Sequence, residues 1–434
     1  MKSGIATVHG YRIWDSRGRP TIEVAVRLVD GTTGRGIAPA GASRGSFEAI
    51  DLRDGGPTLG GFGVERAVAS INAEIGGALI GLDAIDQSGV DNALIALDGT
   101  SNKSRLGGNA TIATSLAVLD AAAKHAGMPL WRHLASGRNV RLPLPEIQIF
   151  GGGAHAGRRI DLQDLMVMPV GAQSFDEALV MVAEVYRTAG ELMAASGRRS
   201  GVADEGGWWP DFDDNEAAIA MLARAIDVAG FRHGEVMISL DVAASEFRVD
   251  GRYAPGPTKR VYETGEWIEV MLGWVARYPI VSLEDPVGED DDAGMAAITA
   301  AIGDRVQIIG DDYLVTNAAR IAGAAARKAC NAVLLKPNQA GTITETIVAM
   351  TAAREAQWGT IVSARSGETE DTTIAHLAVG WNTGQLKVGS FARSERMAKW
   401  NECLRIEREL GADAVYAGAS ALPFSHKVGL RRIR

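Results

Sequence analysis

Residues 279–286 read PIVSLEDP, a short apolar run that ends on two carboxylates and a proline. A run of this length that closes on turn residues is typical of a buried strand. The same pattern, an apolar run with a polar end followed by a helical segment, recurs through the second part of the chain. The other runs are LMVMP (165–169), VMISLDVA (236–243), VQIIGDD (306–312), AVLLKPNQ (332–339), GTIVSARSG (359–367) and QLKVGS (385–390). Strands alternating with helices predict an α/β barrel, whose active site lies where the strands end.

The first part of the chain has a different order. Residues 21–28 (TIEVAVRL) alternate with the two-residue period of a half-buried strand, and residues 112–126 (IATSLAVLDAAAKHA) have a helical period. Residues 137–145 (GRNVRLPLP) contain two prolines and are interpreted as a linker. We therefore expect two domains. Residues 1–138 would form an N-terminal α+β domain that includes a lid loop, and residues 139–434 would form the barrel catalytic domain.

Composition narrows the function classes. The 434 residues are 46% hydrophobic and 22% charged, as in an ordinary globular protein. The formal net charge of -9 argues against a nucleic-acid or anionic-membrane partner. Cys330 and Cys403 form neither a zinc pattern nor a disulfide framework, and no stretch approaches the roughly 20 apolar residues of a membrane span. We expect a cytoplasmic protein.

Three of the expected strand ends carry carboxylates, Asp241, Glu284 and Asp311. Together they would form an oxygen site for a hard cation, and magnesium suits it better than zinc, which prefers imidazole or thiolate. Asp285 and Asp312 are the adjacent alternatives, which strand alternation turns to the other face.

Two further strand ends carry lysines, Lys336 and Lys387. Their simplest role is a salt bridge to a neighbouring carboxylate. The functional role is catalytic, because abstracting a proton next to a carboxylate requires a base and concentrated positive charge, which lysine and magnesium together supply.

Other polar residues near the first barrel strands suit acid–base work. Glu205, in the glycine-rich segment 203–207 (ADEGG), is the best-placed general acid. His155, Gln163 and Asp164 are further candidates, and each could equally be a hydrogen-bonded core residue.

A phosphate site is also indicated. Arg365 and Ser366 offer a guanidinium fork and a hydroxyl that match phosphate oxygens. The early loop 39–45 (PAGASRG) would cover the same site, with Ser43 as a metal ligand and Arg44 adding positive charge.

Several long segments resemble the enolase family, and the resemblance covers nearly the whole chain. The segments are IWDSRGRPTIEV (13–24), GASRGSFEA (41–49), GGAHA (152–156), DEGG (204–207), LDVAASEF (240–247), LEDP (283–286), GDDYLVTN (310–317), KPNQAGTITET (336–346), RSGETEDTTIAHLAVG (365–380) and GSFARSERMAKWN (389–401). The resemblance implies a variant (β/α)8 TIM-type barrel with an N-terminal α+β capping domain, a homodimer or higher homo-oligomer, and two Mg2+ ions.

The resemblance also implies residue roles. A small phosphorylated carboxylate would be the substrate, 2-phosphoglycerate or phosphoenolpyruvate. The implied metal ligands are Asp241, Glu284, Asp311 and Ser43. By the same resemblance, Lys336 would be the base at C2, Glu205 the acid at the C3 hydroxyl and Lys387 the partner of the substrate carboxylate. Arg365 and Ser366 would form the phosphate clamp, with His155 and Gln163 as supporting residues.

The chain departs from the family pattern on one side of the site. Asp164 stands where the family has glutamate, Ala364 where it has histidine, and Gly151 where it has asparagine. In the lid, Ala40 and Arg44 replace a serine and a threonine, and two tryptophans (208–209) follow the acid loop.

This clustering leads to three hypotheses. The first is a diverged enolase-family enzyme, a lyase or an enolase-derived transferase, with lysine-base enolate chemistry in phosphonate or phosphinate natural-product metabolism, such as carboxyphosphonoenolpyruvate synthesis. Arg44 and the space at Ala364 would then serve a second anionic co-substrate. The second is an ordinary enolase that dehydrates 2-phosphoglycerate, and the third a non-catalytic binding protein on the same fold.

Overall fold

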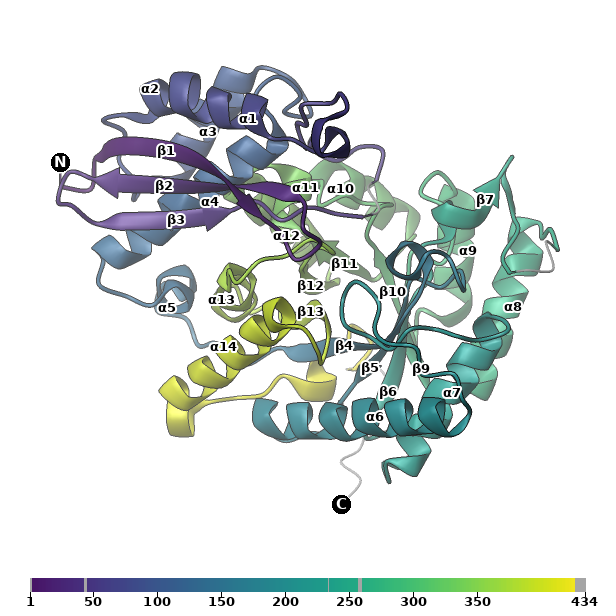
Figure 1. The fold of residues 1–434 in the computed structure, drawn as a ribbon. Helices are drawn as coiled ribbons and strands as arrows, with labels where there is room; N and C mark the ends of the chain where they lie inside the picture. The colour runs from purple at the N-terminus through teal and green to yellow at the C-terminus, as the bar shows by residue number, and fades with distance from the viewer. Residues whose placement is uncertain (1, 43–44, 233, 257–259, 426–434) are drawn as a thin grey trace.

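The computed structural model describes residues 2–42, 45–232, 234–256 and 260–425. A small three-stranded sheet with its helices, coloured purple to blue, sits beside a barrel, coloured teal to yellow (Figure 1). The expected architecture, an N-terminal α+β domain capping an α/β barrel, is confirmed.

The N-terminal sheet is an antiparallel meander in the order β1 (Ile5–Trp14), β2 (Pro20–Leu28), β3 (Thr33–Ile37). Its alternate β2 residues Ile22, Val24 and Val26 are fully buried, which agrees with the period of two in the sequence. In strand β3, a Cβ atom at Gly34 would lie 2.3 Å from the carbonyl oxygen of Ala117, which belongs to helix α4 (Gly108–His125). The glycines of β3 therefore allow α4 to lie directly against the sheet.

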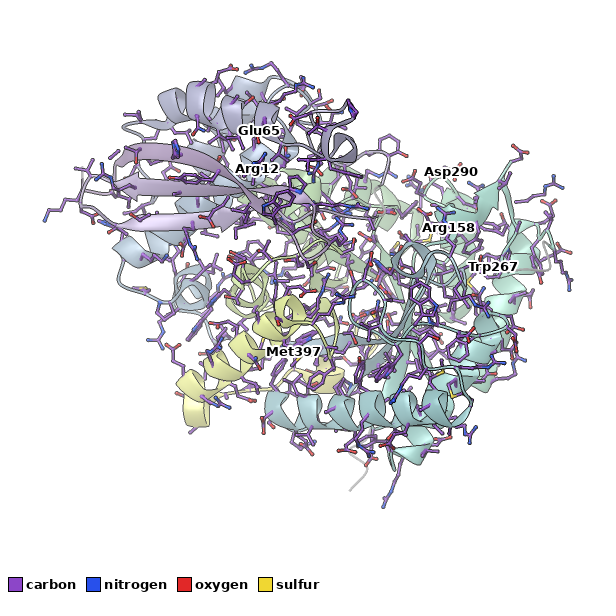
Figure 2. All side chains as sticks on the ribbon, in the orientation of Figure 1. Arg12, Glu65, Arg158, Trp267, Asp290 and Met397 are labelled. Atoms are coloured by element: carbon purple, nitrogen blue, oxygen red, sulfur yellow. The ribbon has the colours of Figure 1, made fainter. Side chains whose placement is uncertain are left out.

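Shorter helices complete this domain: η1 (Thr58–Gly61), α1 (Glu65–Ser70), η2 (Ile71–Ile75), α2 (Gly76–Leu79), α3 (Gln87–Asp98) and α5 (Leu130–Ala135). On the outer surface, Arg12 of β1 pairs with Glu65 at the start of α1 at 2.6 Å (Figure 2). Such an exposed ion pair contributes little stability.

The barrel closes in the order β10-β11-β12-β13-β4-β5-β6-β9. All seven apolar runs of the sequence are strands in it. The strands are β4 (Leu144–Gly151), β5 (Asp164–Met168), β6 (Met237–Asp241), β9 (Ile280–Glu284), β10 (Gln307–Gly310), β11 (Ala332–Leu335), β12 (Gly359–Ser363) and β13 (Gly384–Ser390).

The eighth strand, β4, includes residues that the sequence indicated as linker. Leu144 and Pro145 begin this strand and pair with Gln385 and Leu386 of β13. Proline is tolerated near the beginning of a strand because only one ladder hydrogen bond is lost there. The interpretation of 137–145 as a linker is therefore wrong for its last two residues.

Strand β5 runs against both of its neighbours, β4 and β6, whereas every other neighbouring pair in the barrel is parallel. The start of β5 therefore lies at the rim where the other strands end. Asp164 is the first residue of β5, and for this reason it lies at the rim where the other strands end.

Helices surround the barrel and lie mostly on its outside (Figure 1). Several begin with a side-chain cap, such as Ser174, which accepts a hydrogen bond from the Glu177 amide. These helices are α6 (Phe175–Ala195), α7 (Asn215–Val228), α8 (Thr264–Arg277), α9 (Asp292–Ile302), α10 (Ala318–Arg327), α11 (Pro337–Ala340), α12 (Ile343–Glu355), α13 (Thr373–Gly380) and α14 (Ser394–Leu410).

Short elements occupy the connections: η3 (Gly153–Ala156), η4 (Ala244–Phe247), the ribbon of β7 (Arg248–Val249) and β8 (Arg252–Tyr253), η5 (Gly411–Asp413) and η6 (Gly418–Ala421). Within the described part of the chain, the longer helices are too polar for a bilayer and the apolar ones too short, so none could span a membrane.

Candidate active site

The rim of the barrel brings most of the candidate residues together around one small cavity. Its walls also include Ala364 and, from the lid loop, Gly41 and Ala42. The candidate residues that line it are His155, Gln163, Asp164, Glu205, Lys336, Arg365, Ser366 and Lys387. Ser43 and Arg44 lie outside the described residues.

Lys387 lies at the centre of a group of carboxylates. Its Nζ atom is 2.8 Å from Glu284 Oε2, 2.9 Å from Asp241 Oδ2 and 3.3 Å from Asp164 Oδ2. Burial alone would lower the pKa of Lys387, but the charges of Asp241 and Glu284 raise it well above its usual value. The lysine is therefore a fixed positive charge on this side of the cavity.

Lys336 is paired in a similar way. Its Nζ donates a hydrogen bond to Asp311 Oδ2, and Gln339 Nε2 donates to the other oxygen of that carboxylate at 3.0 Å. Burial lowers the pKa of Lys336, but the Asp311 charge outweighs this effect, so the pKa is raised. Asp311 is the only carboxylate within 4 Å of the Lys336 ammonium among the described residues.

The three carboxylates suit a hard cation. Glu284 is fully buried, its Oε1 atom has no hydrogen-bond partner among the described residues, and burial together with the Asp241 charge raises its pKa well above the usual value. A divalent cation would offset this concentration of negative charge, and carboxylate oxygens are the ligands that magnesium prefers. Asp241, Glu284 and Asp311 therefore have the ligand type that magnesium prefers, and in this structure Lys387 and Lys336 are the cations that pair with them.

Among the described residues, two groups bring one potential ligand atom per residue within 4.8 Å of each other, and the predicted set Asp241, Glu284 and Asp311 is not one of them. The two groups are His155, Asp164 and Glu205, and Asp285, Asp311 and Asp312. In the second group, Asp285 accepts hydrogen bonds from the backbone amides of Asp311 at 2.9 Å and Asp312 at 2.7 Å. Burial and the Asp311 charge raise the pKa of Asp285 to about 8. These bonds fix the end of β10, which positions Asp311.

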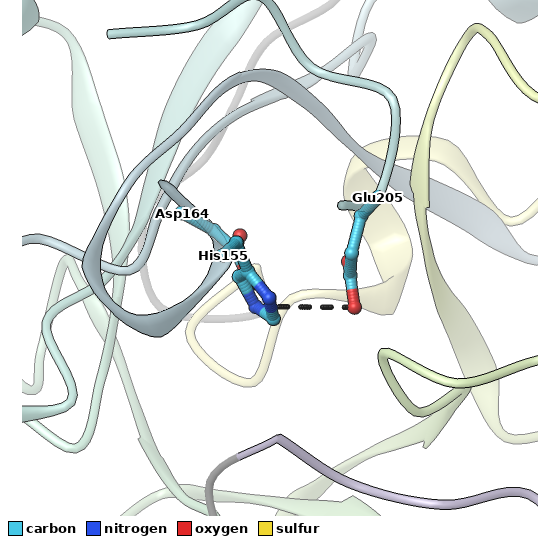
Figure 3. Close-up of side chains that lie close together, drawn as sticks. All are labelled: His155, Asp164 and Glu205. Atoms are coloured by element: carbon cyan, nitrogen blue, oxygen red, sulfur yellow. Dashed lines mark ion pairs between the residues drawn. The ribbon is translucent and has the colours of Figure 1, made fainter. Parts of the chain in front are cut away.

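The acid side of the cavity consists of His155, Asp164 and Glu205 (Figure 3). His155 comes from the short helix η3, and its Nε2 atom is 3.8 Å from Asp164 Oδ1 and 3.9 Å from Glu205 Oε1. Gln163 donates to Asp241 Oδ2 at 3.0 Å and so connects this side to the carboxylate group. All four side chains are buried, which suits groups that exchange protons away from bulk water.

The loop that carries Glu205 is held from several directions. The Tyr186 hydroxyl of α6 donates to the Gly206 carbonyl at 2.9 Å, and the Trp208 indole donates to the Tyr186 carbonyl at 2.9 Å. The two rings stack with centroids 4.9 Å apart. The extra bulk of Trp208 therefore packs against α6 and restrains the loop. Glu205 itself has a cation nearby, because Arg396 Nη1 lies 3.8 Å from its Oε1 atom.

The side of the cavity that is expected to bind phosphate is formed by Arg365, Ser366 and residues 39–42 of the early loop. The Arg365 guanidinium pairs with Glu48 at 3.0 and 3.2 Å, and the Ala42 amide donates to Ser366 Oγ at 2.6 Å. Ala40 forms a two-way backbone bridge with Gly367. The lid loop is thus attached to the clamp that it covers.

Four contributing residues were not identified from the sequence. Gln148, Glu48, Arg17 and Arg396 are buried or nearly so and contact the candidate residues. Arg17, Glu48 and Arg396 lie in the segments 13–24, 41–49 and 389–401, so the family resemblance contained a signal for these three. Gln148 carried no signal, because no strand was predicted at 144–151.

The fold and the site together define a TIM-barrel protein with an N-terminal capping domain and acid–base groups at the strand ends. Residues 5–134 match the family described as "Enolase, N-terminal domain", and residues 139–424 match "Enolase, C-terminal TIM barrel domain". The chain belongs to the enolase family and is an enolase-superfamily enzyme.

Proposed function

We propose that the protein is a diverged, magnesium-dependent enolase-family enzyme that binds 2-phosphoglycerate or phosphoenolpyruvate and uses lysine-base enolate chemistry. One observation carries this proposal: the candidate base, acid, carboxylate partner and phosphate clamp line the same cavity. A three-carbon phosphorylated acid has the groups that these residues would bind. The family typically uses Mg2+, and two ions are expected here.

In the first half-reaction, Lys336 in its neutral form would accept the C2 proton of 2-phosphoglycerate. Lys387 would hold the substrate carboxylate, and Arg365 and Ser366 would hold the phosphate. Magnesium bound to Asp241, Glu284 and Asp311 would supply the positive charge that stabilises the enolate.

In an ordinary enolase reaction, Glu205 would then protonate the leaving C3 hydroxyl, releasing water and phosphoenolpyruvate. The departures from the family pattern lie on this side of the cavity and next to the proposed phosphate clamp. The Ala364 methyl group lines the cavity beside Arg365, and Asp164 contacts Gln148 and Lys387. We therefore infer that the second half-reaction is altered to include a second anionic substrate, as in carboxyphosphonoenolpyruvate synthesis.

An ordinary enolase is the second candidate, and one observation favours it. Glu205 and Asp164 both lie within 4 Å of His155, so the groups needed for dehydration remain together. The shorter Asp164 side chain would then be tolerated.

Incubation with 2-phosphoglycerate and magnesium in deuterated water, followed by NMR, separates these candidates. C2 proton exchange with little phosphoenolpyruvate is the expected result. Rapid formation of phosphoenolpyruvate would instead establish an ordinary enolase. Neither exchange nor binding would indicate a non-catalytic protein on this fold.

A double substitution tests the divergence directly. Ala364→His and Asp164→Glu introduce the family residues, and we expect the pair to raise the rate of dehydration. An unchanged rate in a folded double variant would contradict an altered second half-reaction.

We also propose that the chain divides into domains 1–138 and 139–434 and forms a homodimer. The two family matches, which end at 134 and begin at 139, support the division. Sedimentation analysis would test the dimer.

A further inference from the structure

Gln148 forms a bridge between the two halves of the acid side. It lies in strand β4 and is fully buried. Its Nε2 atom donates a hydrogen bond to Asp164 Oδ1, and its Oε1 atom accepts one from the Gly207 amide at 2.9 Å. Gly207 is two residues beyond Glu205, so one side chain contacts both Asp164 and the loop that carries the acid.

The orientation of this amide is determined by its partners. A backbone N–H can only donate, so the carbonyl oxygen of Gln148 must face Gly207. The NH2 group then faces Asp164 Oδ1, which accepts its hydrogen bond. The amide thus satisfies a donor on one side and an acceptor on the other.

The space around Gln148 depends on two glycines. A Cβ atom at Gly207 would lie 2.4 Å from Gln148 Oε1. A Cβ atom at Gly151 would lie 3.1 Å from the same amide group and 2.7 Å from the Ala203 Cβ. A larger side chain at position 151, such as the asparagine of the family pattern, would therefore compete with the Gln148 amide for the same space.

We propose that Gln148 is a positioning residue that fixes Asp164 relative to the Glu205 loop, and that Gln148, Gly151 and Asp164 function as one unit. The long Gln148 side chain reaches the short Asp164 carboxylate across the β4–β5 pair, and Gly151 leaves room for it. This inference rests on the proposed function for its catalytic consequence, because Asp164 and Glu205 would act at the C3 side of the substrate. The bridge itself does not depend on that function.

The first test measures the bridge in the ligand-free protein. Gln148→Met keeps the length of the side chain but removes both hydrogen bonds, whereas Gln148→Asn keeps the amide and shortens its reach. Hydrogen exchange of the Gly207 amide should become about tenfold faster or more in both variants. Unchanged exchange at Gly207 in the folded Gln148→Met variant would overturn the proposal.

The second test uses the lengths of the two side chains. Gln148→Asn and Asp164→Glu should each speed hydrogen exchange of the Gly207 amide about tenfold or more, because a bridge that is too short or too long cannot keep both of its hydrogen bonds. The double variant Gln148→Asn/Asp164→Glu has the same total length as the native pair and should recover most of the lost protection at Gly207. Additive losses in the double variant would overturn the proposed unit.

The two tests separate the possible failures. If the native protein neither exchanges the C2 proton nor forms phosphoenolpyruvate, the proposed function fails, and the Gly207 measurement still decides the bridge. If the native protein is active and the Gly207 exchange rate does not respond to Gln148→Met, the bridge fails and the proposed function stands.

Discussion

Asp164 lies directly opposite Asp241 in the register of strands β5 and β6. Asp164 is the first residue of its strand and Asp241 the last of its own, and the antiparallel pairing therefore brings them together. Their carboxylates both approach the Lys387 ammonium, at 3.3 and 2.9 Å. The acid side and the carboxylate side of the cavity therefore share one cation. This arrangement depends on the reversed direction of β5.

Replacement of Lys336 by alanine should abolish base function. We expect the rate of C2 proton exchange to fall by about 10² to 10⁴, the usual contribution of a positioned base. Lys124→Ala, on the exposed surface of α4, is the matched control and should exchange at the native rate. Exchange that persists in the Lys336 variant would assign the base to another residue.

Glu205→Gln keeps the shape of the side chain but removes its proton-donating role. Phosphoenolpyruvate formation should fall by about 10² to 10⁴, far more than C2 exchange, because the acid acts at C3 and the base at C2. NMR follows both rates in one sample. Equal loss of the two rates would indicate that Glu205 acts before or during proton abstraction.

Magnesium should stabilise the folded protein through the buried carboxylates. At a concentration about 100 times the dissociation constant, a bound ion adds roughly 2.7 kcal/mol to the free energy of unfolding. Glu284→Gln should remove most of the magnesium-dependent rise in melting temperature, whereas Glu191→Gln, an exposed residue of α6, should retain it. An equal rise in the two variants would place the ion elsewhere.

Glu146 should make stability depend on pH. It is fully buried inside the barrel, where Ser239 Oγ donates to it at 3.1 Å, and burial raises its pKa from 4.5 to about 7 against the opposing charge of Lys387. The folded protein therefore keeps this proton between about pH 4.5 and 7 while the unfolded chain loses it, so stability falls as pH rises through this range.

The Glu146→Gln variant lacks this contribution. Relative to the variant, the native protein should lose roughly 3 kcal/mol of unfolding free energy between pH 4.5 and 7, and little more above pH 7. Denaturant unfolding in EDTA at several pH values measures the difference. Parallel stability curves for the two proteins would show that Glu146 titrates normally.

Much of the fold followed from the sequence because each barrel strand is a continuous apolar run with a polar end. Strand β4 did not follow this pattern, since its first residues are LP and its interior carries the polar residues Glu146 and Gln148, which accept hydrogen bonds from Ser239 and Gly207 inside the barrel. The direction of β5 was not predictable either, because period and composition are the same for parallel and antiparallel strands.

The candidate site was partly predictable for a similar reason. Residue types at strand ends indicated which side chains reach the rim, and eight of the candidates line one cavity there. Their pairings were not predictable: Lys336 with Asp311, Arg365 with Glu48 and Asp164 with Gln148 join residues between 16 and 317 positions apart. Only the folded chain brings such partners within hydrogen-bond distance.

The reversed strand β5 gives the two sides of the cavity separate supports. His155, Gln163 and Asp164 belong to one hairpin, formed by β4, β5 and the segment between them. Both lysines and the carboxylates Asp241, Glu284 and Asp311 instead lie in, or directly after, strands that run in the common direction of the barrel. The two supports meet across the cavity where Asp164 contacts Lys387 and where Gln163 contacts Asp241. A substitution in the hairpin therefore changes the chemistry of one wall of the cavity and affects the other wall through these two contacts.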